Sequence, residues 1–162
     1  MLTLDQIKST LKLEPHPKEG GFFAETYRCT TEIITQNGRL SLHTAIYYLL
    51  TPDSFSEMHR LPGDEMFHFY LGDPVETIQL HPDGTSDIVT LGQDIVLDMK
   101  LQHVVSGGVW QGSRLKPGGR YALLGTTMSP GFAYEDYVSG KAADLIAKWP
   151  GPSAMIRELS RL

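Results

Sequence analysis

Turn clusters recur at short intervals through the middle of this chain, and they constrain its fold more strongly than any other feature of the sequence. Short runs rich in aromatic and β-branched residues alternate with clusters of Gly, Pro and Asp. The clusters are Thr51–Asp53, Pro62–Asp64, Gly72–Pro74, Pro82–Gly84, Ser106–Gly108, Pro117–Gly119 and Pro130–Gly131. Their spacing is close to the roughly 8 to 12 residues typical of antiparallel sandwiches and barrels. The sequence therefore predicts an all-β middle built from antiparallel strands.

Helical patterns are confined to the two ends of the chain. Thr3 precedes Gln6 by three residues, which is a capping-box pattern, and apolar residues then follow at helical spacing. In residues 140–162, apolar residues at helical spacing are interrupted by Pro150–Pro152. Between two predicted strands, Asn37–Gly38 is typical of a type I′ hairpin turn. We expect one short N-terminal helix, a hairpin at Asn37–Gly38 and two short C-terminal helices.

Composition and charge exclude several classes of protein. Lys and Arg total 14 against 19 Asp and Glu, and the net charge of −5 has the wrong sign for binding a nucleic-acid backbone. The longest uninterrupted apolar run, Ala45–Leu50, has six residues, far below the roughly 18 needed to span a bilayer. The N-terminus lacks the charged and apolar regions of a signal peptide, and the single cysteine excludes an internal disulfide. We expect a cytoplasmic protein without nucleic-acid or membrane partners.

A histidine and a glutamate lie on either side of one Pro-Gly turn. His59 ends one predicted strand and Glu65 opens the next, so an antiparallel hairpin would bring the two side chains together. Strand alternation places Phe67, Phe69 and Leu71 on the same face as Glu65. This pattern predicts an imidazole and a carboxylate in a cavity with aromatic walls. The alternative is a surface histidine near a turn and a solvated glutamate.

At these residues the sequence resembles the cupin superfamily, whose first motif is Gly-x5-His-x-His-x3,4-Glu-x6-Gly. His59 matches the first His, and Glu65 and Gly72 follow at the intervals of the motif. Leu61 stands at the second His position and Asp53 at the opening Gly.

The second cupin motif, Pro-x-Gly-x-x-His, is similar to Ser106–Gln111, in which Gln111 takes the His position. Further stretches narrow the resemblance to a subgroup of small stand-alone cupins of uncharacterised function. They are residues 17–28, 46–50, 64–70 and 129–132. The resemblance covers about residues 4 to 140. It implies one cupin domain over residues 1–162, with a jelly-roll barrel over about residues 20–138, commonly paired as a dimer. It also implies a pocket like that of sugar-nucleotide epimerases.

The resemblance implies a weakened metal site. A cupin site offers three imidazoles and one carboxylate to a divalent ion. Here Leu61 and Gln111 replace two of those four ligands, and an amide oxygen is a weak ligand beside imidazole. We expect no cofactor. A divalent metal, if bound, would be held by His59, Glu65 and Gln111.

Without a metal, His59 and Glu65 in an apolar pocket suit the removal of a proton next to a carbonyl. Burial raises the pKa of a carboxyl group, and a nearby carboxylate raises that of a histidine. In this hypothesis His59 is the general base, and Glu65 is its orienting partner or the acid. Gln111 donates to a carbonyl or hydroxyl oxygen of the ligand.

Other residues are candidates for binding the ligand. Tyr47 and Tyr48 lie on opposite faces of one predicted strand, so only one of them can face inward, and we assign Tyr47 to the pocket. Arg28 beside Glu25 would bind an anionic group through its guanidinium, or would form a salt bridge at the barrel rim. Phe132 would line the mouth of the pocket, and Phe67 and Phe69 its walls.

These residues support function hypotheses from different classes. The first is an isomerase or epimerase that acts by proton transfer on a small carbohydrate-like or keto-acid ligand. The second is a cupin that binds a ligand without catalysis, and the third, weakened by the missing imidazoles, is a metal-dependent oxygenase. We also predict a homodimer, because His68, Tyr70 and Trp110 place large amphipathic side chains on an outer sheet face. The alternative is that the C-terminal helices cover that face within one chain.

Overall fold

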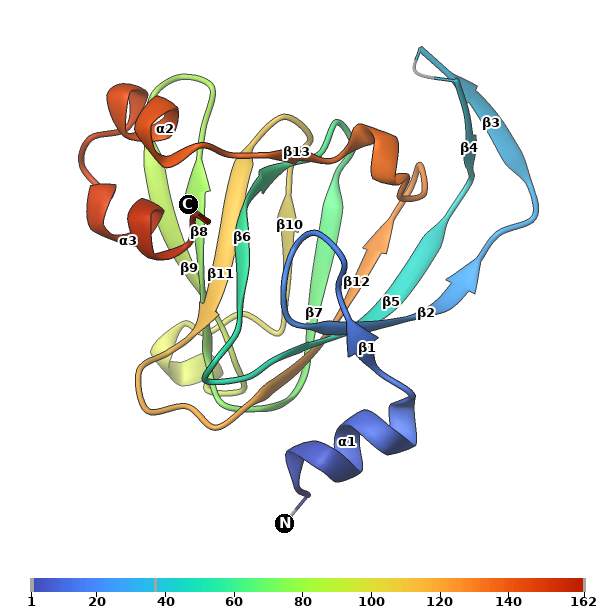
Figure 1. Ribbon diagram of the computed structural model, residues 1–162, viewed down its shortest axis with the longest axis horizontal. Helices are drawn as coiled ribbons and strands as arrows, with labels where there is room; N and C mark the ends of the chain where they lie inside the picture. The colour runs from blue at the N-terminus through green and yellow to red at the C-terminus, as the bar shows by residue number, and fades with distance from the viewer. Residues whose placement is uncertain (1, 37, 162) are drawn as a thin grey trace.

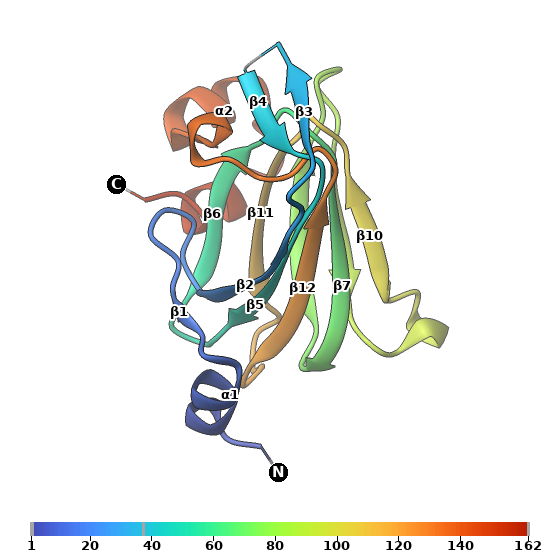
Figure 2. The ribbon, with the colours of Figure 1, turned by 90° about the vertical axis from the view of Figure 1, so that its right-hand side faces the viewer.

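Two antiparallel β-sheets pack face to face and form the body of the molecule (Figures 1 and 2). The computed structural model describes residues 2–36 and 38–161. In the first sheet, named the β12 sheet, the strand order is β1 (Glu14–Pro15), β2 (Phe22–Arg28), β5 (Thr44–Leu50), β12 (Ala122–Met128), β7 (Glu65–Gly72) and β10 (Gln102–Val105). In the second, named the β11 sheet, it is β13 (Val138–Ser139), β6 (Phe55–Arg60), β11 (Trp110–Leu115), β8 (Val75–Leu80) and β9 (Ser86–Leu91). The predicted antiparallel jelly roll is confirmed.

The helices lie at the ends of the chain, as predicted. Helix α1 (Leu4–Leu11) begins with the expected capping box, in which the backbone N–H of Gln6 donates to the Thr3 hydroxyl and the Gln6 side chain accepts from the Thr3 N–H. Helices α2 (Ala142–Lys148) and α3 (Ser153–Glu158) cover the outer face of the β11 sheet (Figure 1). Short 3-10 helices occur at Ile95–Leu97 and Tyr134–Asp136. Among the described residues, every helix is too short or too polar to cross a membrane.

A separate hairpin of β3 (Glu32–Thr35) and β4 (Gly38–Ser41) projects from the body (Figure 1). The predicted hairpin is therefore present. Thr35 pairs with Gly38, so Gly38 belongs to β4 rather than to the connecting turn. The predicted type I′ turn includes Asn37, which lies outside the described residues.

Apolar side chains of both sheets fill one end of the space between them. Tyr48, Phe67 and Leu124 of the β12 sheet pack there with Val75 and Leu115 of the β11 sheet. Burying side chains of this size contributes about 1.5–3 kcal/mol each. The opposite end, formed by the starts of β5 and β7 and the end of β12, holds the polar side chains and the cavity of the candidate site.

A register shift places Leu71 on the outer face of the β12 sheet. Phe69 pairs with Leu124 and Leu71 with Leu123, so β7 carries one extra residue at this point. A bulge of this kind reverses the alternation of side chains beyond it. Leu71 packs outside the barrel near Ile7 of α1, and the prediction that it shares the face of Glu65 is wrong.

Candidate functional site

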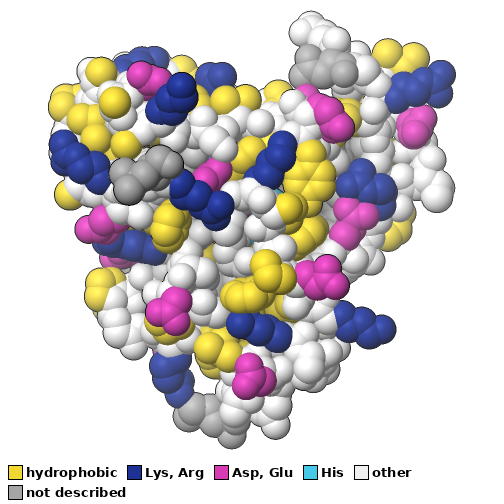
Figure 3. All heavy atoms as spheres, viewed as in Figure 1, with side chains coloured by type: hydrophobic (Ala, Val, Ile, Leu, Met, Phe, Trp, Pro, Cys, Tyr) yellow, Lys and Arg dark blue, Asp and Glu magenta, His cyan; other side chains and the backbone are white. Residues whose placement is uncertain are grey.

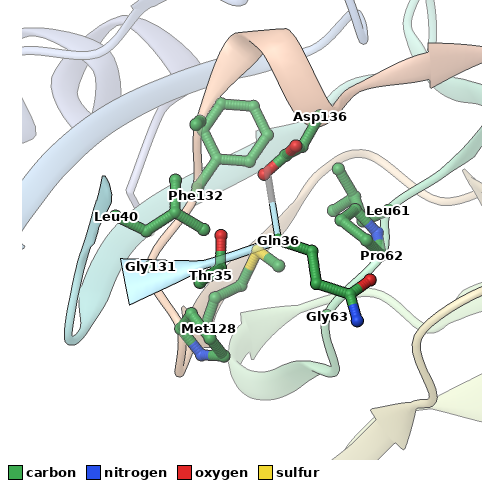
Figure 4. A pocket seen from close by; sticks show the side chains of 12 residues that line it. Thr35, Gln36, Leu40, Leu61, Pro62, Gly63, Met128, Gly131, Phe132 and Asp136 are labelled. Carbon is green, nitrogen blue, oxygen red and sulfur yellow. The ribbon is translucent and has the colours of Figure 1, made fainter. Parts of the chain in front are cut away.

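Two adjoining cavities open at the polar end of the barrel. The inner chamber, of about 50 Å³, is lined by His16, Glu19, Phe23, Glu25, Arg28, Thr44, Ile46, Leu61, Glu65, Thr126, Met128, Phe132 and Tyr134. The outer pocket, which we name the vestibule, has a volume of about 260 Å³ and shares Leu61, Met128 and Phe132 with the chamber. Hairpin side chains Gln36 and Leu40 point into the vestibule (Figure 4).

The hairpin forms one wall of the vestibule. On the face shown in Figure 3, hydrophobic side chains gather where the β3–β4 hairpin meets the body, with charged side chains around them. A ligand that reaches the inner chamber therefore has an apolar space beside the hairpin for the rest of its structure.

Glu65 is the carboxyl group of the predicted pair, and it lines the inner chamber. It opens β7, is 7% exposed, and accepts a hydrogen bond of 2.8 Å from the side-chain amide of Gln111. Burial, and then repulsion from Glu19, raise its pKa to about 7. Near neutral pH such a group exists in both protonation states, which suits a general acid or base.

His59 lies next to this carboxyl group but does not line the chamber. It is 1% exposed, stacks on Tyr137 at 4.9 Å between ring centroids, and pairs with Gln111 across the β6–β11 ladder. Its Nδ1 lies 2.7 Å from the backbone carbonyl of Glu57. Because a carbonyl oxygen only accepts, Nδ1 carries the proton and Nε2 presents a lone pair. Burial lowers the pKa of His59, although the charge of Glu65 opposes this effect.

Two buried acceptors at this position lack donors. Among the described residues, neither His59 Nε2 nor Gln111 Oε1 has a hydrogen-bond partner. Unpaired buried polar atoms are rare, and each calls for an explanation such as water or a ligand. The structure thus brings His59, Glu65 and Gln111 together, while only Glu65 reaches the inner chamber.

The inward tyrosine is Tyr48, and the assignment of Tyr47 to the pocket is wrong. The Tyr48 hydroxyl donates to the carbonyl oxygen of Gly20 at 2.8 Å, inside the barrel. Tyr47 packs on the outer face, where its ring meets Tyr70 at 6.0 Å. Only the register of β5 against its neighbours decides which of two adjacent tyrosines faces inward.

The predicted aromatic walls are only partly correct. Phe67 and Phe69 belong to the apolar core at the other end of the barrel, and neither lines the chamber or the vestibule. Phe132 lines both cavities, as expected of a residue at the mouth. Arg28 also lines the chamber, but its guanidinium is occupied by the Glu25 carboxylate at 2.7 and 3.0 Å and by the Phe132 carbonyl.

Sequence reasoning missed a second buried acidic group, Glu19. It follows β1 and precedes Gly20 and Gly21, whose positive φ angles of 99° and 67° turn the chain back into β2. The hydroxyl of Ser56 donates to it at 2.5 Å, and burial raises its pKa to about 7. In the sequence, the two glycines indicate a tight turn at this position, but they do not indicate that Glu19 is buried.

Glu57 is a third buried carboxyl group, and residues from the C-terminal part of the chain hold it. It accepts from the Tyr137 hydroxyl at 3.0 Å and the Ser139 hydroxyl at 2.6 Å. Arg161 Nε lies 3.2 Å from its second oxygen. No spacing in the sequence connects Arg161 to this strand.

The donor set does not fit the metal site that the resemblance implies. Within the described ranges, no group of three or more His, Cys, Asp or Glu could hold a metal ion. Leu61, at the second His position, packs with Met128 and Tyr137. Gln111 offers only its amide oxygen, a weak ligand, so the site has one imidazole lone pair and one carboxylate where three imidazoles and one carboxylate are expected.

Relatives of this chain match it over nearly its full length. An uncharacterized Saccharomyces cerevisiae protein, YML079W, is 30% identical over 93% of this chain and 81% of that protein. A hypothetical protein from Leishmania major is 30% identical with a TM-score of 0.91, covering 99% of this chain and 100% of that chain. Protein SO0799 from Shewanella oneidensis is 32% identical with a TM-score of 0.89, covering 99% of each chain.

More distant structures share the fold alone. A dTDP sugar isomerase from Desulfovibrio desulfuricans has a TM-score of 0.53 at 13% identity, over 74% of this chain and 83% of that chain. An oxalate decarboxylase from Bacillus subtilis has a TM-score of 0.57 at 12% identity, over 91% of this chain and 37% of that chain. The family described as Cupin superfamily (DUF985) matches residues 5–139, which span both sheets and the inner chamber. This protein therefore belongs to that cupin family.

Proposed function

We propose that this protein is an isomerase or epimerase that moves a proton on a small carbohydrate-like or keto-acid ligand. The observation that carries the proposal is the buried Glu65 carboxyl group, which lines the small inner chamber and has a pKa raised to about 7 by burial. A carboxyl group tuned in this way can take a proton from carbon and return it at neutral pH.

The surrounding residues support this role for Glu65. Gln111 and Thr126 both interact with the Glu65 carboxyl group, which lines the chamber together with Thr126. His59 is buried next to Glu65, outside the chamber lining, and its Nε2 lone pair can accept a proton through a bridging water or ligand hydroxyl. A dTDP sugar isomerase shares this fold, which is consistent with chemistry on a carbohydrate.

The size of the two cavities indicates how a ligand would bind. A chamber of about 50 Å³ admits only the reactive end of a ligand. The remainder would lie in the vestibule of about 260 Å³, against Leu40 and Phe132. Arg28, at the chamber wall, would bind an anionic substituent by exchanging its bond to Glu25.

Deuterium exchange tests the proposal directly. The protein is incubated in D2O with a panel of keto sugars and keto acids, and loss of the α-proton signal is followed by NMR. Glu65→Gln and His59→Ala should each reduce exchange by about 10²- to 10⁴-fold. Tyr47→Phe is the matched control, since Tyr47 packs outside the barrel. If no compound of the panel exchanges its α-proton, the proposed isomerase or epimerase activity is rejected.

The second candidate is a cupin that binds a ligand without catalysis. It is favoured by the position of His59, which is buried and outside the chamber lining. Under this alternative, Glu65→Gln changes the affinity for panel compounds and no compound exchanges its α-proton. A metal-dependent oxygenase is the weaker third candidate, because the donor set lacks two imidazoles.

We also propose a second copy of this chain as a partner. The prediction that Trp110 shares an outer face with His68 and Tyr70 is wrong, because Trp110 lies on the β11 sheet, where helices α2 and α3 cover it. The helices leave the outer face of β7 and β10 open. Met66, Tyr70 and Val104 are exposed there, and His68 stacks on Tyr70 at 6.4 Å. An exposed apolar and aromatic sheet face of this kind suits a symmetric contact between two copies.

A further inference from the structure

The two buried histidines near the chamber carry their protons on opposite ring nitrogens. His59 donates through Nδ1 to a backbone carbonyl, so its Nε2 is an acceptor. His16 has the reverse arrangement. Its Nδ1 accepts from the backbone N–H of Glu19 at 2.9 Å and of Lys18 at 3.3 Å. A neutral His16 therefore carries its proton on Nε2.

The Nε2–H of His16 is available to a ligand. His16 lines the inner chamber together with Glu65, and its side chain is 4% exposed. The nearest acidic oxygen, Glu19 Oε2, lies 4.0 Å away, which is beyond hydrogen-bonding distance. Among the described residues this N–H makes no hydrogen bond.

The surroundings keep His16 neutral and hold its ring in place. Burial, and then repulsion from His59 and Arg161, lower its pKa to about 4. The ring edge packs on Phe23 at 4.6 Å between centroids, and the two backbone N–H groups fix its rotation. A neutral imidazole is a known device for polarising a carbonyl group, because its N–H donates without carrying a full charge.

We propose that His16 Nε2–H holds the carbonyl oxygen of the ligand while Glu65 exchanges the proton on the adjacent carbon. This inference rests on the proposed function and narrows the ligand to compounds whose exchanging C–H lies next to a ketone or aldehyde. His16 lies outside both cupin motifs, and no spacing in the sequence links it to Glu65.

The step is balanced without an oxidant or reductant. Glu65 removes the proton from carbon, the C–H electron pair forms a carbon–carbon double bond, and the carbonyl π electrons move to oxygen. His16 Nε2–H stabilises the resulting enolate oxygen. Return of the proton from the Glu65 carboxylic acid to carbon restores the carbonyl group. The chamber of about 50 Å³ accommodates this reacting end, and the vestibule in Figure 4 accommodates the rest.

Two substitutions separate a donor role from a structural role. In His16→Asn the side-chain oxygen takes the place of Nδ1 and still accepts from the Glu19 and Lys18 N–H groups, but the shorter side chain places no N–H at the position of Nε2. In His16→Gln an amide N–H extends toward the position of Nε2, but the backbone contact is lost. If His16 acts as a hydrogen-bond donor, His16→Asn should lower the rate of α-proton exchange by about 10²- to 10³-fold, and His16→Gln should retain part of that rate.

A structural role predicts the reverse order, with His16→Asn active and His16→Gln impaired, and this result would overturn the inference. Thermal melting of both variants shows whether each is folded. Nitrogen-15 NMR of labelled histidines provides a readout besides activity: His16 should be protonated at Nε2 and His59 at Nδ1 at pH 7.5. The opposite tautomer at His16 would also overturn the inference.

A small enolate analogue distinguishes failure of this inference from failure of the proposed function. Acetohydroxamate should shift the nitrogen-15 signal of His16 Nε2 in the wild-type protein. A shift without α-proton exchange by any panel compound supports the donor and rejects the isomerase. Exchange that His16→Asn leaves unchanged supports the isomerase and rejects the donor. Absence of any shift on saturation with acetohydroxamate rejects the donor.

Discussion

The Glu65→Gln substitution should change how the stability of the protein depends on pH. In the folded protein, burial raises the pKa of Glu65 from 4.5 to about 7. The folded state therefore binds the proton more tightly than the unfolded chain does. This contributes stability that is fully present below pH 4.5 and is lost as the pH rises through 7. The difference in pKa corresponds to about 3 kcal/mol.

The variant lacks this titration but keeps the local contact. A glutamine has nearly the same shape, and its amide oxygen still accepts from Gln111. The free energy of unfolding of the variant, minus that of the wild type, should rise by up to about 3 kcal/mol between pH 4.5 and pH 8. Urea denaturation at closely spaced pH values measures this difference.

Comparison of the two proteins removes the contributions of other groups. The raised pKa of Glu19, about 7, gives a pH dependence of the same sign as Glu65. The lowered pKa of His16, about 4, has the opposite sign, because its contribution is lost as the pH falls below 6.5. The contribution of His16 is present in both proteins and largely cancels in the difference. That of Glu19 cancels only in part, because the Glu19 carboxylate repels Glu65.

The control is Glu135→Gln, which removes one exposed carboxyl group and reports the effect of the net charge alone. If the Glu65→Gln difference stays constant from pH 4.5 to pH 8, the reasoning that burial raises this pKa is wrong. The proposal that Glu65 acts as an acid or base near neutral pH would lose its support.

Arg161→Ala should destabilise the protein by about 1–3 kcal/mol in thermal or urea melts, because it leaves the buried Glu57 carboxylate without its cationic partner. Adding Glu57→Gln to this variant should restore part of the lost stability. An unchanged melting curve for Arg161→Ala would show that this ion pair is not stabilising. Light scattering at micromolar concentration should report a mass near twice 18.0 kDa for the wild type, and Tyr70→Glu should shift it toward the monomer. A wild-type protein that scatters only as an 18.0 kDa species contradicts the homodimer.

Local signals in the sequence were sufficient for much of the architecture. The Thr3–Gln6 capping box, the turn clusters and the helical spacing near the C-terminus each act over a few residues, so they can be read without knowing the fold. The intervals that join His59, Glu65 and Gly72 also span a single turn, so the sequence could bring His59 and Glu65 close together. The predicted antiparallel hairpin is wrong, because β6 and β7 belong to different sheets and do not pair with each other.

Tertiary structure alone decided how these elements meet. Whether Tyr47 or Tyr48 faces inward depends on the register of β5 between β2 and β12, and the position of Leu71 depends on one extra residue in β7. Alternation by itself is symmetric, so it cannot choose between the two faces of a sheet.

The inner chamber draws its polar groups from segments far apart in the chain. His16 and Glu19 come from the loop between β1 and β2, and Glu65 opens β7. Arg161 approaches the neighbouring Glu57 from beyond α3. The sequence by itself determined the strands, the helices and the proximity of His59 and Glu65 across one turn, because those depend on short-range patterns. Only the packing of the two sheets determined which side chains share the chamber and how burial tunes their protons, since both depend on contacts between distant residues.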